Sequence, residues 1–410
     1  MTEVQSPPFH ERLLSKQAQG VRSWLPASAA PPSVPLLILA GGVPDPAALP
    51  FAAIAEATSA VMSQEEEAKL ALQYGGPQGP PPLRQELAAW IGSTEGIELT
   101  REHFMLTNGS AQALDNVCRA FLDSGDAVIV ENPSFSGSIR SFRGPGAIIH
   151  GVALDEKGMV TEALRETAEA VRASGAPLKL IYTIPNFHNP AGVTMTLDRR
   201  RELVEIAREY GAIIVEDAAY DGLRFDGEDL PSLYTLAGGE GVIRIGTFSK
   251  IIATGLRLGY SQADPEVVKA LINLRFDMGT SPFLARMVVE LMRDGTMERH
   301  RQEMIDLYRS KRDAMLAGLE EHCADYCSWS RPEGGFFIWL ELKPGHTSQE
   351  VSSAAYREGS VVVPGDSFFS DEDRDNFVRL AYSYIALDDI PEAIRRLGVA
   401  LQKTYEASAA

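Results

Sequence analysis

The stretch KLIYTIPNFHNPAGVTMTLDRRRELVEIAREYGAIIVED (179–217) decides the fold, because it predicts a strand, a helix and a second strand. KLIYTI (179–184) and AIIVED (212–217) are short apolar strands, and RRRELVEIAREYG (199–211) is a helix that ends at a glycine. The strands are uninterrupted apolar runs, which is typical of strands covered on both faces. The stretch therefore predicts one unit of a parallel sheet.

The same alternation of strands and helices extends outward, from about residue 102 to residue 262. FML (104–106), AVIVE (127–131) and VIRIGTF (242–248) are further candidate strands. A helix after TNGS (107–110) carries apolar residues at helical spacing: Leu114, Val117, Cys118, Phe121 and Leu122. Alternation of this kind favours an α/β fold.

The pattern changes after about residue 283. One long helical stretch (roughly 283–320) precedes a strand pair, FFIWLEL (336–342) and VVVP (361–364), and then FVRLAYSYI (377–385) and a final helix. We predict an α/β fold, in which a large domain with a mostly parallel sheet sandwiched by helices is joined by a smaller α+β domain built from both chain ends. The expected limits are 1–50 for an N-terminal arm and part of the small domain, 51–300 for the large domain and 301–410 for the small C-terminal domain.

Composition excludes several classes of partner. The chain has 410 residues and a net charge of −18, which disfavours nucleic acid and anionic membranes. Three cysteines give no disulfide framework, and Cys323 and Cys327 lack the further ligands of a zinc site, so we expect no metal. Because no run approaches the roughly 20 apolar residues of a membrane span and the N-terminus lacks a signal-peptide core, we expect a soluble, cytoplasmic protein.

Polar residues gather where the predicted strands end. Ligands of an open parallel sheet bind beyond the carboxyl ends of its strands. The residues at four such ends are Gly109-Ser110-Ala111-Gln112, Asn189, Asp217, and the group Thr247, Ser249 and Lys250. This convergence predicts one binding site at that edge of the sheet.

These residue types suit a pyridine ring that carries a phosphate. A helix N-terminus at Ser110 and Ala111 attracts an anion, and further donors and charge come from Thr247, Ser249 and Arg257. Asp217 could keep the ring nitrogen protonated, and Asn189 and Tyr220 could reach a ring hydroxyl. Lys250 offers an amine for a Schiff base and a general base.

Nine segments match one protein family in order across residues 39–400. They are LAGGVPDPAALPF (39–51), YGGPQGPPPLRQELAAWI (74–91), LTNGSAQALD (106–115), VIVENPSFSG (128–137), YTIPNFHNPAGVTM (182–195), IIVEDAAYDGLRF (213–225), IGTFSKIIATGLRLGY (245–260), RPEGGFFIWLEL (331–342) and VRLAYSYI (378–385). The chain resembles the fold-type-I aminotransferases of class I/II, in the branch of 2-aminoadipate, kynurenine and aromatic-amino-acid aminotransferases.

The resemblance implies a pyridoxal 5'-phosphate enzyme that moves an amino group between an L-amino acid and a 2-oxo acid by a ping-pong mechanism. It implies that the large domain binds the cofactor, with Lys250 as the Schiff-base lysine, Asp217 at the ring nitrogen, and Asn189 and Tyr220 at the ring oxygen. The residues implied around the phosphate are Ser110, Ala111, Thr247, Ser249 and Arg257, and we add the adjacent Gln112 to the cofactor site.

The resemblance also implies groups for stacking, for the substrate and for a second subunit. Phe135 takes the place of a ring that stacks on the cofactor, and Tyr74 resembles a tyrosine that reaches the phosphate of a neighbouring subunit in a homodimer. Arg379 resembles the arginine that binds the substrate carboxylate, where the backbone N–H of Gly42 could also meet it. Two positions depart from the family: Phe135 stands where Tyr is usual, and His188 stands before Asn189 where Gln is frequent.

Alternatives remain at this stage. The same scaffold supports decarboxylation, elimination, cyclisation or oxidation of an amino acid. A non-enzymatic sensor domain of a transcription regulator needs a helix-turn-helix domain ahead of the family region, where about 38 residues precede LAGG, so we do not expect one. The amino donor, the acceptor and any role of Arg22 or His188 stay open.

Overall fold

The predicted strand–helix–strand unit is present in the computed structural model, which describes residues 13, 34–370 and 374–409. It consists of β6 (Leu178–Thr183), α8 (Leu197–Tyr210) and β7 (Ile213–Asp217). β6 and β7 pair in parallel, with Leu180 opposite Ile213. Gly211, at φ 69°, ends α8 in the left-handed conformation that favours glycine.

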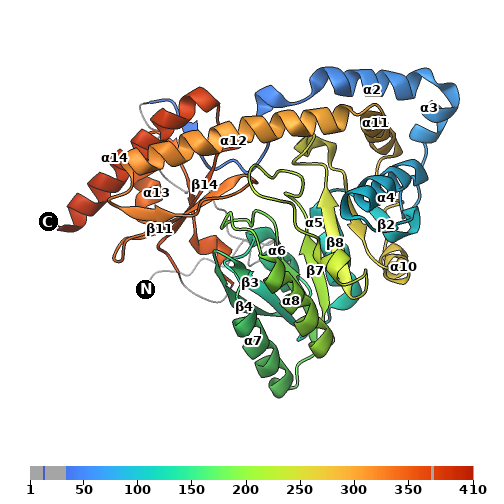
Figure 1. Ribbon diagram of the computed structural model, residues 1–410, viewed down its shortest axis with the longest axis horizontal. Coiled ribbons are helices and arrows are strands. Elements are labelled where there is room, and N and C mark those ends of the chain that lie inside the picture. Colours follow the sequence, from blue (N-terminus) through green and yellow to red (C-terminus); the bar gives the residue numbers. More distant parts are fainter. Residues whose placement is uncertain (1–12, 14–33, 371–373, 410) are drawn as a thin grey trace. The chain divides into compact units, whose positions relative to one another are not determined.

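The larger sheet is mixed and mostly parallel, as predicted (Figure 1). In spatial order its strands are β2 (Phe104–Thr107), β9 (Gly259–Gln262), β8 (Val242–Thr247), β7, β6, β3 (Ala127–Asn132), β4 (Ile148–Asp155) and β5 (Gly158–Met159). β9 runs antiparallel to both β2 and β8, and β5 runs antiparallel to β4. The four pairs between β4 and β8 are parallel, so their carboxyl ends share one edge.

Alternate residues of the central strands pack into different hydrophobic clusters. Ile129, Ile181 and Ile214 pack with residues of α7 (Thr161–Ser174) and α8. Their neighbours Val128, Leu180 and Val215 pack in a second cluster with residues of α4 (Pro81–Glu95) and α5 (Ser110–Phe121). Because successive strand residues point to opposite faces, this division explains why both faces of these strands are apolar.

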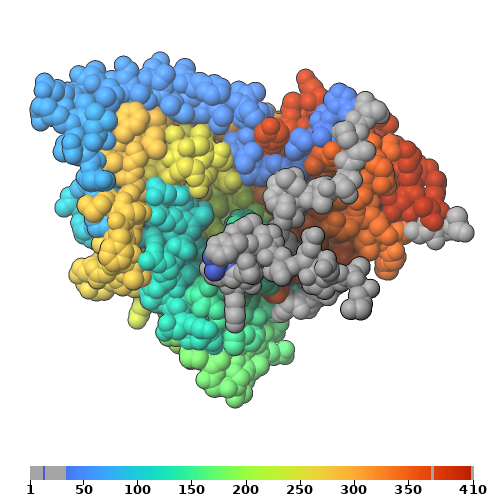
Figure 2. Space-filling view, turned by 180° about the vertical axis from the view of Figure 1, so that it is seen from behind, coloured from blue at the N-terminus to red at the C-terminus, as the bar shows by residue number. Residues whose placement is uncertain are grey.

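The remaining helices of the first part of the chain are α2 (Phe51–Ser63), α3 (Glu65–Ala71), α6 (Ser136–Arg143), α9 (Leu233–Leu236), α10 (Pro265–Asn273) and α11 (Pro282–Arg293). Figure 2 shows α2 and α3, in blue, next to α11, in gold, with which both pack. The long helical stretch predicted over roughly 283–320 is present as two helices. Gly295, at φ 74°, separates α11 from α12 (Thr296–His322).

The C-terminal part contains a smaller antiparallel sheet in the order β10 (Cys327–Trp329), β11 (Phe337–Leu342), β14 (Phe377–Ala381) and β13 (Val363–Pro364). The two strands predicted as a pair are not neighbours, because β14 lies between β11 and β13. Here α12 packs beside α14 (Ile390–Ala409), and α13 (Ser348–Arg357) packs on α14 (Figure 1). The last helix has an apolar face that packs in the core, since Ile390, Ile394, Leu397 and Leu401 are fully buried.

Both chain ends contribute to this smaller part. β1 (Leu37–Ile38) pairs in parallel with β12 (Ser360–Val361). Residues Pro32–Ala410 cluster as one unit, so the predicted limits at 50 and 300 stay a prediction. The arm proper and Arg22 lie outside the described residues. None of the helices in the described ranges combines the length and apolar character that a membrane crossing needs.

Candidate active site

Lys250 follows the carboxyl end of β8 and is partly buried. Its Nζ donates a hydrogen bond to the carbonyl oxygen of Gly42, at 2.8 Å. Burial and the nearby Arg379 cation together lower the pKa of this amine to about 8, against the opposing effect of Asp217. Lys250 is therefore not an ordinary surface lysine.

Asp217 ends β7 and is buried with its carboxylate held by two donors. The hydroxyl of Tyr182 donates to Oδ2 at 2.7 Å, and the backbone N–H of Ala219 donates to Oδ1 at 3.1 Å. Burial raises the pKa of Asp217 to about 6, although both hydrogen bonds oppose that rise. Tyr182 was not among the predicted site residues.

Arg379 lies on β14 and reaches the larger sheet. Its Nη1 donates to Oδ1 of Asn189 at 3.0 Å, and the Nδ2 of Asn189 lies 3.4 Å from the hydroxyl of Tyr220. The Arg379 guanidinium carbon lies 4.4 Å from the ring centroid of Phe337. No carboxylate pairs with Arg379 among the described residues, its Nε has no partner there, and burial lowers its pKa to about 10. The site therefore joins the two sheets around an uncompensated cation.

A second group of residues surrounds the N-terminus of α5. Gly109 precedes this helix at φ 83°, and a Cβ there would lie 2.8 Å from Nη2 of Arg257. Arg257 itself adopts a left-handed backbone at φ 47°, an uncommon state for a residue with a side chain. At the carboxyl end of β8, Thr247 Oγ1 donates to Ser249 Oγ at 2.9 Å. A cation, hydroxyls and the free N–H groups at Ser110 and Ala111 form a site suited to phosphate.

The other predicted residues differ in their placement. Gln112 is engaged elsewhere, because its Oε1 accepts from the N–H of Asn108 at 2.7 Å and its Nε2 donates to Asp277 at 2.8 Å. Phe135 lies at the N-terminus of α6 with its ring against Gly137. Tyr74 is 79% exposed and makes no hydrogen bond to the other candidates in the described chain. The roles of all three stay predictions.

His188 is fully buried beside Asn189. Its Nδ1 accepts from the N–H of Ala191 at 3.3 Å, and its Nε2 lies 3.0 Å from Oε2 of Glu131. Glu131 also accepts from the hydroxyl of Thr183 and the N–H of Ile184. These contacts link the loop after β6 to Glu131 on β3.

These donors fit a pyridine ring with a phosphate. Lys250 is partly buried, and the carboxylate of Asp217 is buried with no cation at hydrogen-bond distance in the described chain. A protonated ring nitrogen would compensate Asp217, and a dianion would compensate Arg257 at the α5 N-terminus. The uncompensated Arg379 suits a substrate carboxylate.

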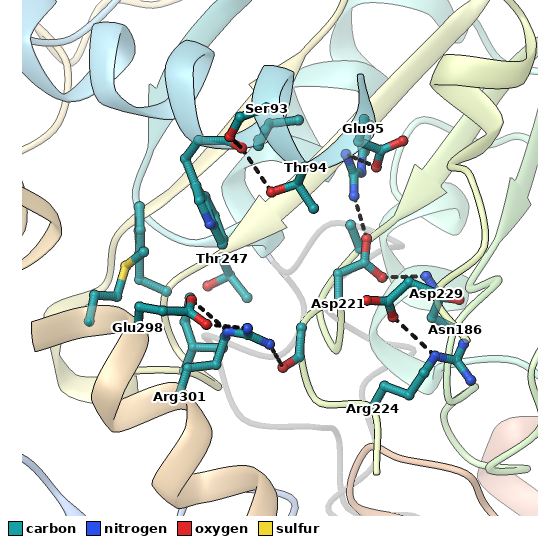
Figure 3. A pocket seen from close by; sticks show the side chains of 18 of the residues that line it. Ser93, Thr94, Glu95, Asn186, Asp221, Arg224, Asp229, Thr247, Glu298 and Arg301 are labelled. Atoms are coloured by element: carbon teal, nitrogen blue, oxygen red, sulfur yellow. Dashed lines mark hydrogen bonds and ion pairs between the residues drawn. The ribbon is translucent and has the colours of Figure 1, made fainter. Parts of the chain in front are cut away.

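A cavity of about 790 Å³ lies next to this site, lined by α4, the segment after β7 and the start of α12 (Figure 3). Of the candidate residues, Thr247 alone lines it. Its ionic side chains pair with one another, as in Arg244 with Glu95 at 3.0 Å and Arg224 with Asp229 at 3.1 Å. It is therefore not the place where the candidate residues converge.

Comparisons with known proteins agree with this geometry. Residues 36–397 match the family described as aminotransferase class I and II. The aromatic-amino-acid aminotransferase 1 of Thermococcus litoralis is 36% identical over 96% of this chain and 94% of its own length. The 2-aminoadipate transaminase of Thermus thermophilus is also 36% identical, over 94% of each chain. The kynurenine aminotransferase of Pyrococcus horikoshii, solved in complex with PMP, has a TM-score of 0.90 and 35% identity over 96% of this chain and 98% of its own.

The names of these relatives favour transamination over decarboxylation, elimination, cyclisation or oxidation. The fold is that of the fold-type-I aminotransferases, and the cofactor of such enzymes is pyridoxal 5'-phosphate. The chain therefore belongs to the class I and II aminotransferases and is a pyridoxal-phosphate-dependent enzyme that transfers amino groups.

Proposed function

We propose that Lys250, Asp217 and Arg379 carry the transamination in this chain, assisted by Asn189 and Tyr220. The observation that supports this most is the meeting of a partly buried amine after β8, a buried carboxylate at the end of β7 and an uncompensated cation on β14. Pyridoxal phosphate, when bound, supplies an electron-withdrawing ring that stabilises negative charge at the substrate α-carbon.

Lys250 acts in this proposal as the covalent anchor and then as the proton carrier. A lysine with a pKa of about 8 has a far larger neutral fraction at pH 7 than one with the ordinary value of 10.5. Only the neutral amine is a nucleophile or a base. Its Nζ would take the α-proton of the amino acid and hold it during the transfer of the amino group.

Arg379 orients the substrate. A guanidinium has five N–H donors, and two of them are used on neutral oxygens, Oδ1 of Asn189 and the carbonyl of Ala40 at 3.1 Å. The remaining donors, including the unpartnered Nε, can bind a carboxylate as a fork. The substrate α-carboxylate thus supplies the missing negative charge.

Asp217 holds the ring nitrogen in its protonated state. Tyr182 and Ala219 fix the carboxylate orientation, so both oxygens are already placed before a ligand arrives. Asn189 and Tyr220 meet at 3.4 Å and together receive the ring oxygen.

The test is the variant Lys250→Ala. We expect turnover to fall by at least 10²–10⁴-fold, on the order of a lost general base, while pyridoxamine phosphate still binds. Lys269→Ala, on an exposed lysine paired with Glu266, is the control and should keep full activity. Wild-type-like turnover in Lys250→Ala would refute the proposal.

The proposal includes a homodimer with shared sites. Three apolar residues on adjoining segments are exposed: Tyr74, Phe276 at 88% and Met278 at 46%. The segments are joined, since Nη1 of Arg275 donates to the carbonyl of Pro77 at 3.0 Å. A partner subunit would cover these side chains and receive Tyr74 near its phosphate.

Subunit mixing tests the shared site. Lys250→Ala and Tyr74→Ala subunits, each impaired alone, should regain activity when mixed, because one of the two sites then has both native residues. No regain in a mixture that sedimentation shows to be dimeric would contradict the assignment of Tyr74.

Substrate class is proposed from the relatives. The names of the relatives include aromatic amino acids and 2-aminoadipate, and the aromatic rings of Phe337 and Phe368 flank Arg379. We expect L-phenylalanine, L-tyrosine, L-kynurenine or L-2-aminoadipate to convert the cofactor to its amine form without an added oxo acid. The cytoplasmic location stays a prediction.

A further inference from the structure

The loop Ala40–Asp45 borders the candidate active site and forms neither helix nor strand. Four successive carbonyl oxygens in it accept side-chain hydrogen bonds. Ala40 accepts from Arg379 at 3.1 Å and Gly42 accepts from Lys250 at 2.8 Å. The carbonyls between and after them, of Gly41 and Val43, accept from the hydroxyl of Ser383 at 3.2 and 2.8 Å. The loop thus contacts the two cations on which the proposed reaction depends.

The loop fits its surroundings closely. A Cβ at Gly41 would lie 2.9 Å from Cβ of Tyr384, and a Cβ at Gly42 would lie 2.8 Å from Cζ of Phe337. Two successive glycines are flexible in themselves, so side-chain anchors must determine where their carbonyls point.

The anchor is a buried ion pair at the end of the loop. Nζ of Lys311, whose side chain is fully buried on α12, lies 2.6 Å from Oδ2 of Asp45. The same ammonium donates to the carbonyl of Ser383 at 3.0 Å. One turn earlier on α12, the hydroxyl of Tyr308 accepts from the N–H of Asp45 at 3.3 Å. Lys311 therefore holds both the loop and the residue that binds two of the loop carbonyls.

A buried ion pair is a poor source of stability, because desolvation of both charges offsets their attraction. Its geometry is nevertheless restrictive, since removing either charge leaves the other uncompensated. Nothing in the proposed reaction uses Lys311 or Asp45 directly.

We propose that Lys311 and Asp45 are positioning residues, whose ion pair fixes the loop Ala40–Val43 and thereby the orientation of Arg379 toward the substrate carboxylate. This inference rests on the proposed roles of Arg379 and Lys250. It assigns a function to an ion pair between the long helix α12 and the loop, which has no direct part in the proposed reaction.

The test compares holoenzymes of Lys311→Met, Asp45→Asn and the double variant Lys311→Met/Asp45→Asn. The single variants leave a buried charge unpaired and should melt at lower temperature, whereas the double variant should recover most of that loss. In all three, amide hydrogen exchange of residues 40–45 should accelerate by about tenfold or more. The half-saturating concentration of L-phenylalanine in the first half-reaction should also rise by about tenfold or more, since small misplacements of positioning groups have such effects. The visible absorbance of the bound cofactor should be unchanged.

The control is Lys403→Met, which removes an exposed pair with Glu358 and should change neither measurement. If Lys311→Met does not fold, Tyr308→Phe removes the acceptor of the Asp45 N–H and should raise exchange in the same residues. Unchanged exchange and half-saturation in the double variant would overturn the inference, whatever its melting temperature. Failure of the proposed function would appear instead as an active Lys250→Ala variant.

Discussion

Tyr182 offers a sharp test of how the sheet controls Asp217. The two residues lie on neighbouring strands, and the tyrosine hydroxyl donates to Oδ2 of Asp217 at 2.7 Å. Burial raises the pKa of Tyr182 well above its ordinary value, so the phenol keeps its proton and remains a donor. Tyr182→Phe removes this hydroxyl and keeps the buried ring, which packs edge-on against Phe142.

The magnitude follows from the chemistry of one hydrogen bond. A neutral donor to a carboxylate contributes about 1.5–3 kcal/mol to the ionised form, which equals roughly one to two pH units. The pKa of Asp217 is already raised to about 6 by burial, and the hydroxyl opposes that rise. Without the hydroxyl, Asp217 should titrate between roughly pH 7 and 8.

The assay is the affinity of the apoenzyme for pyridoxamine phosphate as a function of pH, because this probe forms no covalent bond with Lys250. A protonated Asp217 cannot pair with a protonated ring nitrogen, so affinity should fall on the acid side of its pKa. The phosphate of the probe titrates equally in both proteins. The difference between wild type and Tyr182→Phe in the pH at which affinity is half lost on the acid side therefore reports the change in the pKa of Asp217.

The matched control is Tyr234→Phe, a buried tyrosine in the hydrophobic cluster on the opposite face of the sheet. It should leave the midpoint where it is. An unmoved midpoint in Tyr182→Phe, or a midpoint that moves to lower pH, would refute the reasoning that this hydroxyl stabilises the ionised carboxylate.

Two further variants test the other charged groups. Arg379→Met should raise the half-saturating concentration of amino donors at least tenfold. Because the Arg379 cation lowers the pKa of Lys250, this variant should also move the pH midpoint of Lys250 acylation in the apoenzyme upward from about 8. A midpoint that stays in place would contradict this coupling. Asp217→Asn should weaken binding of pyridoxamine phosphate. It should nevertheless stabilise the apoenzyme at pH 7 by up to about 3 kcal/mol in denaturant unfolding, because burial raises the pKa of Asp217 from 3.8 to about 6. An unchanged or lower stability would argue against a buried ionised carboxylate.

The sequence predicts the large sheet well because its strands are continuous apolar runs. The helix break at Gly295 was missed, since the apolar spacing continues on both sides of it and one glycine is tolerated within many helices. The order of β11, β14 and β13 was also missed. Strand neighbours in an antiparallel sheet depend on tertiary packing, and nothing in VVVP identifies β14 as its partner.

The sequence predicts the position of Asp217 and Lys250 at strand ends, but it does not predict the side chains that contact them. In the sequence, Tyr182 resembles any other core residue of the apolar strand KLIYTI (179–184). Only the register, which sets Tyr182 opposite Val215, shows that Asp217 lies two residues further along the same face. Lys311 and Asp45 are 266 residues apart, so the sequence offers no local signal for their pairing.

The ionised forms of the three charged groups of the site are all disfavoured by burial. Burial favours the neutral form of each, raising the pKa of Asp217 and lowering those of Lys250 and Arg379. For Asp217 the sign is opposite to that of a salt-bridged carboxylate, because its stabilising contribution is lost as pH rises from about 4 to about 6. For Lys250 stability is instead gained as pH rises from about 8 toward 10.5. At neutral pH both groups therefore oppose folding of the apoenzyme, and a ligand that brings the complementary charges removes that opposition. Cofactor and substrate binding should consequently stabilise this fold, because each brings a charge that compensates one of these groups.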